Sequence, residues 1–361
     1  MDFGYFAMPL HPPGTDYTRS LHGDLDQIVE LDRLGYREAW IGEHFTSEWE
    51  NIPAPDLFIA AALERTKNIV LATGVSCLPN HNPFVLAHRI AQLDHMARGR
   101  FHWGVGSGGF PGDLEVFGYG EGKKDNRIMT RQAVEAVLEL WRSPKPGNHN
   151  TNYFDYTVPR PEKNIGLRVY LKPYQKPHPP IGVAGVTPKS STLALAGERG
   201  WIPMSINLVP EWVLKTHWVA VQEGAKRAGR RPQRKTWRIA REVFVGTTAR
   251  AAMNEAKKGV LARDWNQYFY PLLKRDGMLK LCKIDQDMPD RAVTADYMAE
   301  NVWIVGGPDE VAEKIAKLHA AVGGFGVLLA MAHEWAPAPR WKESFRLLRQ
   351  VVQPKLAKAG I

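Results

Sequence analysis

The residues best suited to chemistry are an adjacent acid and histidine, Glu43 and His44, which end a short apolar run within 38–46. The run has the composition of a buried strand, so the pair lies where that strand stops. An imidazole titrates near neutral pH and can act as a general acid or a general base. A histidine at a strand end can equally serve only to hydrogen-bond the backbone, and the pattern leaves both roles open.

Two further segments have residue types that bind anions. Glycines recur within 104–112, directly after another apolar run, and glycine lets backbone N–H groups approach a phosphate closely. Ser190 and Ser191 precede a helical pattern that continues to Arg199, so either serine can cap that helix and leave N–H groups free for a phosphate. Arg127, at the start of another helical pattern, is a third candidate. Each also has a plainer interpretation: a tight turn, a helix cap and a surface arginine.

The sequence contains no common nucleophile motif. It lacks a serine elbow, an HExxH pair and a lysine-centred motif, and Cys77 and Cys282 are too far apart to suggest a ligand cluster. We therefore expect no metal site. A proton-handling group and anion-binding loops without a nucleophile predict that a bound cofactor supplies the difficult chemistry.

Strand and helix patterns alternate along almost the whole chain and must position these residues. The apolar runs that predict strands lie at 1–8, within 38–46, and at 68–73, 99–106, 181–184, 201–206, 238–245 and 325–331. Close to eight strand-then-helix units predict a (β/α)₈ TIM barrel, as a single domain over 1–361. An open doubly wound sheet is less suitable, because prolines rather than a glycine fingerprint follow the first strand. Segments 143–180 and 263–300 break the alternation and are predicted insertions.

In such a barrel, the loops after the carboxyl ends of the strands form the active site. The candidate residues fall in loops of this kind. His81 follows the third strand, Ser205 ends the sixth, and His333 follows the last. We therefore expect polar side chains and flexible backbone to converge at one end of the barrel.

Composition argues against other classes of protein. The net charge is +9, but the basic residues are interleaved with acids and form no aromatic-studded tract, so we expect a solvated surface and no nucleic-acid partner. No window of eighteen apolar residues and no secretory signal pattern is present. The expectation is a cytoplasmic protein with no membrane partner.

The chain resembles the bacterial luciferase-like flavin monooxygenases, especially the branch of diketocamphane and limonene 1,2-monooxygenases. The resemblance is carried by 40–46 (WIGEHFT), 49–53 (WENIP), 195–200 (LAGERG) and 305–310 (VGGPDE). These segments occur in the family's order and span nearly the whole chain.

The resemblance implies a two-component enzyme with a separate NAD(P)H:flavin reductase. Reduced FMN from the reductase would react with O₂ to give a flavin C4a-hydroperoxide, which inserts one oxygen atom into an organic substrate. His44 falls on the family's catalytic histidine. Phe45 replaces a second histidine of luciferase, so light emission is not implied. A homodimer is expected from the family.

The same resemblance assigns FMN contacts to several loops. Gly74 and Val75 fall on a non-prolyl cis peptide beneath the isoalloxazine ring. Luciferase has an arginine at the position of Ser107, so charge compensation for the phosphate would depend on Arg127. The remaining expected contacts are Gly106, Gly108, Gly109, Gly185, Val186, Ser190, Ser191 and Ser205.

Aromatic residues near His44 predict an apolar cyclic substrate, such as a monoterpene or a cyclic ketone. The expected pocket residues are Trp40, Phe45, Trp49, His81 and His333. The sequence does not distinguish epoxidation, hydroxylation and Baeyer–Villiger insertion. Two alternatives stay open: a deazaflavin (F420)-dependent oxidoreductase with the same barrel, and a flavin-binding homologue without catalysis.

Overall fold

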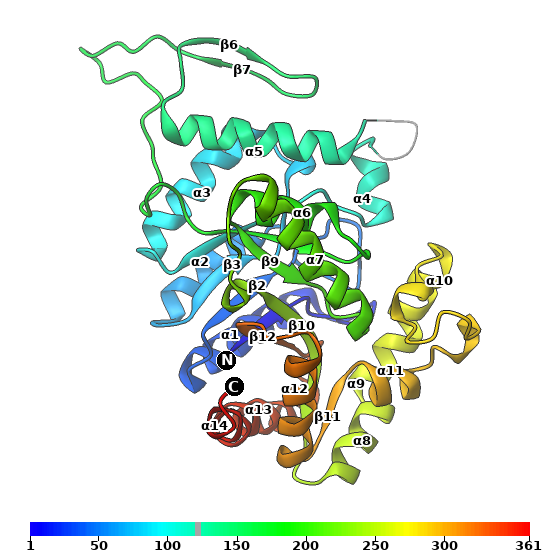
Figure 1. Ribbon diagram of the computed structural model, residues 1–361. Coiled ribbons are helices and arrows are strands. Elements are labelled where there is room, and N and C mark those ends of the chain that lie inside the picture. The colour runs from blue at the N-terminus through cyan, green and yellow to red at the C-terminus, as the bar shows by residue number, and fades with distance from the viewer. Residues whose placement is uncertain (120–123) are drawn as a thin grey trace.

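A closed parallel barrel forms the centre of the computed structural model, which describes residues 1–119 and 124–361 (Figure 1). Pairing of the last strand with both the first and the seventh closes the sheet. The predicted (β/α)₈ barrel is thereby confirmed. The strands around the barrel are β1 (Asp2–Ala7), β2 (Glu38–Ile41), β3 (Val70–Thr73), β5 (Phe101–Gly106), β8 (Ile181–Gly185), β9 (Ile202–Ser205), β10 (Arg238–Val245) and β12 (Val327–Met331).

Helices cover the outside of the barrel (Figure 1). The first begins at Tyr17, where Asp16 caps it by accepting a hydrogen bond from the Arg19 N–H. Gly35, with a φ of 81°, ends the same helix. The helices are α1 (Tyr17–Leu34), α2 (Pro55–Arg65), α3 (Pro83–Ala97), α4 (Pro111–Val116), α5 (Asn126–Arg142), α6 (Ser191–Arg199), α7 (Glu211–Arg227), α8 (Ala249–Lys258), α12 (Pro308–Ala321), α13 (Ala338–Leu347) and α14 (Gln353–Lys358).

The barrel interior is packed with side chains and is not a pore. Phe6, Trp40, Met204 and other apolar residues fill it, while the alternate residues of each strand pack against the helices. At the amino end, the guanidinium of Arg238 donates to both carboxylate oxygens of Glu38 at 2.9 Å. This buried ion pair closes the end of the barrel opposite to the predicted site.

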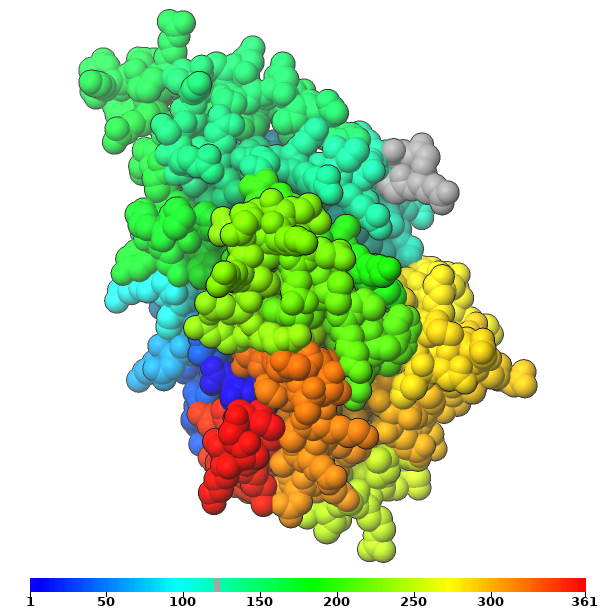
Figure 2. All heavy atoms as spheres, in the orientation of Figure 1, coloured from blue at the N-terminus to red at the C-terminus, as the bar shows by residue number. Residues whose placement is uncertain are grey.

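The two segments that break the alternation lie outside the barrel, as predicted. In 143–180, β6 (Gly147–Asn150) and β7 (Asp155–Val158) form an antiparallel hairpin beyond α5 (Figure 1). In 263–300 the chain is mainly helical and includes the end of α9 (Val260–Asp264), a π-helical turn at Trp265–Phe269, α10 (Tyr270–Arg275) and α11 (Ala295–Asn301). Figure 2 shows this second insertion as a yellow lobe beside the barrel. A short strand, β11 (Ile304–Gly306), then pairs with the carboxyl end of β10.

Neither a membrane-spanning helix nor a metal-binding cluster occurs in the described ranges. Over 1–119 and 124–361, each helix is too short or too polar to cross a bilayer. Within the same residues, His, Cys, Asp and Glu side chains form no group of three or more that could hold a metal ion.

Candidate active site

His44 lies just beyond β2, at the carboxyl end of the barrel, between two carboxylates. Its Nε2 is 3.0 Å from Glu50 Oε2, and its Nδ1 is 3.6 Å from Asp113 Oδ2. The ring of Phe110 meets the imidazole edge-on, with the ring centres 4.9 Å apart. Both ring nitrogens therefore face acceptors, and an aromatic wall covers part of the ring.

The two carboxylates make His44 a charged group at neutral pH. Burial by itself lowers the pKa of the imidazole, but the nearby carboxylates of Glu50 and Asp113 outweigh it and raise this pKa to about 10. Burial also favours the neutral form of Asp113, yet its bonds with His44 and Thr46 lower the pKa of that carboxyl. The pKa of His44 is therefore higher than the near-neutral value expected from the sequence. The ring is suited to donate a proton rather than to accept one.

Asp113 is held in place by the loop that carries His44. Its Oδ1 accepts the Thr46 hydroxyl at 2.6 Å and the Thr46 N–H at 2.9 Å, and the Phe45 N–H lies 3.2 Å away. Sequence reasoning missed both Asp113 and Glu50 as partners of His44. The available signals were the position of Asp113 just after the glycine-rich run and of Glu50 inside the WENIP segment.

Glu43, the acid next to His44, serves a different histidine. Its carboxylate is 3.0 Å from His81 Nε2 and accepts hydrogen bonds at 3.3 Å from the Asn80 side chain and the Cys77 N–H. Glu43 therefore ties the loop after β2 to the loop after β3. The expected pocket residue His81 is engaged in this contact at the edge of the site.

The loops expected to hold the flavin ring and its phosphate follow β3 and β5. The Gly74–Val75 peptide bond is cis, which confirms that prediction. A Cβ on Gly106 would lie 2.4 Å from a methyl group of Val75, so the close approach of these two loops requires glycine there.

The turn after β5 is attached to the start of α5. The Asn126 side chain donates to the carbonyl oxygens of Ser107 and Gly108 at 3.0 and 3.1 Å. Arg127, the next residue along the helix, is exposed, and a Cβ on Gly109 would meet no atom of the described residues within 4 Å. The exposed Arg127 therefore follows directly after the residue that is hydrogen-bonded to the turn at Ser107 and Gly108.

The loop after β8 provides a second set of N–H groups. Ser190 is the N-cap of α6 and accepts from the Leu193 N–H at 3.4 Å, whereas Ser191 is exposed. A Cβ on Gly185 would come within 2.8 Å of the Ser190 hydroxyl, so glycine makes room for the cap, and Val186 follows it. Because β8 pairs directly with β5, both anion-binding candidates follow neighbouring strands.

Three expected contacts need correction, because their side chains are fully buried. The Ser205 hydroxyl accepts from the Trp237 indole at 2.9 Å and contacts His217 Nδ1 at 2.9 Å, which leaves it no free face for a cofactor. Trp40 fills the barrel interior beneath the site, and its indole donates to Glu38 at 2.8 Å.

His333, the third of these, pairs with a different acid. Its Nδ1 is 3.0 Å from Asp264 Oδ2, and Glu242 lies 3.8 Å from its Nε2. Burial opposes the charged form, but these two carboxylates raise the pKa of His333 to about 9. Its side chain has no exposed surface with which to line a substrate pocket.

The remaining pocket candidates, Phe45 and Trp49, lie around His44. Phe45 is exposed and packs edge-on against Phe117 at 5.3 Å, and Trp49 stacks on Tyr268 at 5.6 Å. A cavity of about 420 Å³ between the loops after β1 and β2 is lined by His44, Phe45 and their neighbours.

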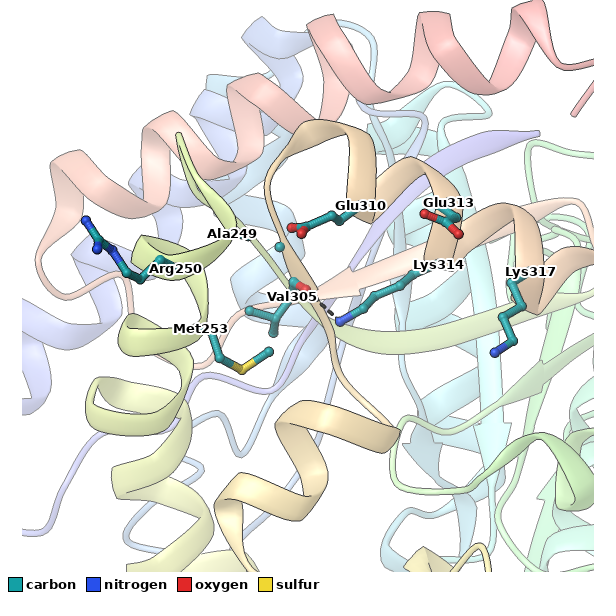
Figure 3. Close-up of a pocket in the computed structure, with 9 residues that line it drawn as sticks. Ala249, Arg250, Met253, Val305, Glu310, Glu313, Lys314 and Lys317 are labelled. Carbon is teal, nitrogen blue, oxygen red and sulfur yellow. Dashed lines mark hydrogen bonds between the residues drawn. The ribbon is translucent and has the colours of Figure 1, made fainter.

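A second cavity, of about 480 Å³, is drawn in Figure 3. Its lining comes from α8, β11 and α12, and Lys314 donates there to the Val305 carbonyl oxygen at 2.7 Å. This cavity therefore belongs to a different part of the molecule from His44.

Comparison with known proteins gives full-length matches. Residues 1–323 match the sequence profile of the luciferase-like monooxygenases. The 4-hydroxyprotoasukamycin monooxygenase of Streptomyces nodosus subsp. asukaensis is 32% identical, over 98% of this chain and 92% of that protein. The 3,6-diketocamphane 1,6-monooxygenase of Pseudomonas putida is 31% identical, over 99% of this chain and 98% of that protein.

A solved structure resembles the chain at a similar level of sequence identity. It is the oxygenating constituent of 3,6-diketocamphane monooxygenase from the CAM plasmid of Pseudomonas putida, a type II Baeyer–Villiger monooxygenase in complex with FMN. The two structures superpose with a TM-score of 0.91 at 31% identity, over 99% of each chain.

Proposed function

Because the chain belongs to the luciferase-like monooxygenase family, we propose that it uses reduced FMN and O₂ to insert one oxygen atom into a small, apolar, cyclic substrate. It is a flavin-dependent monooxygenase, and its cofactor is FMN. The observation that supports the proposal best is the placement of His44 between Glu50 and Asp113 at the mouth of the barrel.

The loops of this chain fit an FMN phosphate. The turn at Ser107 and the first N–H groups of α6, beginning at Ser191, follow neighbouring strands, and Arg127 adds a positive charge. Backbone N–H groups at a helix start and a nearby guanidinium are the donors that a phosphate prefers. Bound reduced FMN supplies the electrons that activate O₂.

His44 would act as the proton donor of the reaction. Its imidazolium carries a proton on each nitrogen, and these nitrogens lie 3.0 Å from Glu50 and 3.6 Å from Asp113. A small rearrangement would present one of the protons to an oxyanion that develops beside the ring. The Phe110 ring covers part of this region and limits the access of water. The two carboxylates keep the imidazole charged and hold its orientation.

The surroundings of His44 favour an apolar substrate with a compact ring system. Phe45 lines the cavity of about 420 Å³ beside His44 together with Pro12 and Pro53, and Phe110 and Phe117 pack behind His44 and Phe45. A cavity of this volume lies within the range that accommodates small organic ligands. The named relatives act on a diketocamphane and on 4-hydroxyprotoasukamycin, so cyclic ketones and other oxygenated ring compounds are the first substrates to test.

We further propose that a separate NAD(P)H:flavin reductase delivers the reduced FMN. The chain aligns over its whole length with a protein described as an oxygenating constituent, which supports a division of labour between two proteins. The homodimer expected from the family stays a prediction.

The test is product formation from reduced FMN. Purified protein is loaded anaerobically with reduced FMN and mixed with O₂ and a panel of bicyclic ketones, monoterpenes and polar amines, and products are analysed by mass spectrometry. A gain of one oxygen atom in the cyclic substrates supports the proposal, and oxidation confined to polar amines contradicts it. His44→Gln should lower the rate by about 10² or more. Unchanged turnover in that variant removes His44 from the mechanism.

Binding measurements separate the alternatives. Tight binding of reduced FMN with weak binding of F420 is expected, and the reverse order would support the deazaflavin-dependent oxidoreductase. A protein that binds reduced FMN but oxidises no compound of the panel would instead be a flavin-binding homologue without catalysis.

A further inference from the structure

The second insertion reaches the His44 site through one side chain, Tyr268. Tyr268 lies on the π-helical turn Trp265–Phe269 and is buried. Its hydroxyl donates to Glu50 Oε1 at 2.6 Å, and the other oxygen of that carboxylate is 3.0 Å from His44 Nε2. One carboxylate therefore joins the insertion to the histidine.

The hydrogen bonds around Glu50 form a closed ring whose direction can be assigned. The Glu50 N–H donates to the Ser47 hydroxyl oxygen at 3.1 Å. Since the single proton of the Tyr268 hydroxyl is used toward the Glu50 carboxylate, the Ser47 hydroxyl must be the donor in its 3.1 Å contact with Tyr268. The Tyr268 hydroxyl therefore accepts from the Ser47 hydroxyl and donates its proton to the Glu50 carboxylate.

The tyrosine is itself held firmly. Its ring stacks on Trp49 with the planes 26° apart, and the Trp265 indole, on the same turn, donates to the Val293 carbonyl oxygen at 3.1 Å. Directly before the turn, Asp264 is 3.0 Å from His333. A side chain fixed on both sides can orient a carboxylate, and local π-helical turns are frequent at functional sites.

We propose that Tyr268 is a positioning residue for the oxygenation: its hydroxyl fixes the Glu50 carboxylate against His44 and so keeps the imidazole protonated and oriented. The inference rests on the proposed role of His44. The charged groups facing that imidazole are Glu50, from the loop after β2, and Asp113, from α4, whereas Glu43 is engaged with His81. The second insertion thus contributes to proton handling and not only to substrate specificity.

Two roles of the Tyr268 hydroxyl predict different changes in the pKa of His44 when Tyr268→Phe removes it. If the hydroxyl only withdraws negative charge from the Glu50 carboxylate, removing it increases the charge that this carboxylate presents to His44. The pKa of His44 then stays unchanged or rises. If the hydroxyl positions Glu50, the carboxylate turns away and the pKa of His44 falls by about one to two units, the usual effect of losing a close opposite charge.

The experiment is an NMR titration of His44 in the full chain without flavin, with the signal assigned by comparison with His44→Gln. Tyr268→Phe is compared with Tyr297→Phe, which removes a hydroxyl from α11 in the same insertion, where it bonds the backbone of Ile284 and Cys282. A fall in the pKa of His44 in Tyr268→Phe alone supports the proposal. An unchanged or higher value, or an equal fall in both variants, overturns it.

A double-mutant cycle adds a second readout. In a Glu50→Gln background the carboxylate charge is already gone, so Tyr268→Phe should produce no additional shift in the pKa of His44. A further fall of the same size would show that the tyrosine acts by another route and would overturn the proposal. If Tyr268→Phe does not fold, Ser47→Ala replaces it. That variant removes the donor to the tyrosine oxygen, and its titration should move in the same direction.

The oxygenation assay keeps this proposal separate from the proposed function. A lowered pKa of His44 in Tyr268→Phe, in a protein that oxygenates no substrate, would retain the positioning role and reject the function. In an active enzyme, the alkaline limb of the pH–rate profile should move to lower pH in Tyr268→Phe and not in Tyr297→Phe.

Discussion

Replacing Arg238 by methionine tests how the barrel is held together beneath the active site. Arg238 donates two hydrogen bonds of 2.9 Å to Glu38, whose side chain is completely buried. The Trp40 indole would be the main remaining donor to Glu38 among the described residues, because Arg37 lies 3.8 Å away on a mostly exposed side chain. Removing one partner of a buried ion pair costs about 3–5 kcal/mol, since it leaves a charge buried without compensation. We expect Arg238→Met to lose that much free energy of unfolding near neutral pH.

The loss should depend on pH. In the native chain, burial favours the neutral carboxyl, but the charge and hydrogen bonds of Arg238 outweigh it and lower the pKa of Glu38. A group with a lowered folded-state pKa stabilises the fold above its unfolded-state pKa, and this contribution disappears as pH falls through the folded value. In Arg238→Met only burial remains, the pKa of Glu38 rises, and the carboxyl can take up a proton. The deficit relative to the native chain should therefore shrink as pH falls through this raised pKa toward the unfolded-state value.

Denaturant unfolding followed by tryptophan fluorescence measures both expectations. The double variant Glu38→Gln/Arg238→Met is the control, because it leaves no buried charge and should recover part of the lost stability. A loss below about 1 kcal/mol in Arg238→Met, the range of an exposed ion pair, would refute the reasoning. A deficit that does not change with pH would refute the assignment of the loss to Glu38.

Three further predictions concern the active site and its supports. Glu50→Gln keeps the side chain's shape but removes its charge, so the pKa of His44, now about 10, should fall by about one to three units. Because the proposed proton donor is the protonated imidazole, the alkaline limb of the pH–rate profile should move to lower pH, and an unmoved limb would contradict this. Arg127→Gln should weaken binding of reduced FMN about tenfold, which corresponds to a loss of about 1.4 kcal/mol of binding free energy. Binding of reduced riboflavin, which lacks the phosphate, should not change. Equal weakening of both would exclude a phosphate contact. Gly104→Ala places a Cβ 2.0 Å from the Thr73 carbonyl oxygen, so denaturant unfolding should show a loss of about 1–3 kcal/mol, and native stability would contradict this account of the packing.

The sequence by itself determined the barrel and the loops that bear the site. Strand and helix periodicities are local, and they placed His44 just beyond a strand end and Ser190 at a helix start. The cis Gly74–Val75 bond was also predicted, although only through resemblance to the family. Such features depend on residues close together in the chain, which is why sequence patterns can reveal them.

Only the tertiary structure decided which groups act on His44. Glu43 is its neighbour in the chain but pairs with His81, because the chain directs the two adjacent side chains to different partners. Asp113 comes from α4, which follows another strand, and Tyr268 and Glu50 are 218 residues apart. Contacts of this range follow from barrel closure and from the docking of the second insertion. These contacts turn a histidine expected near neutrality into a half-buried imidazolium between two carboxylates, because closely placed carboxylates outweigh the effect of burial.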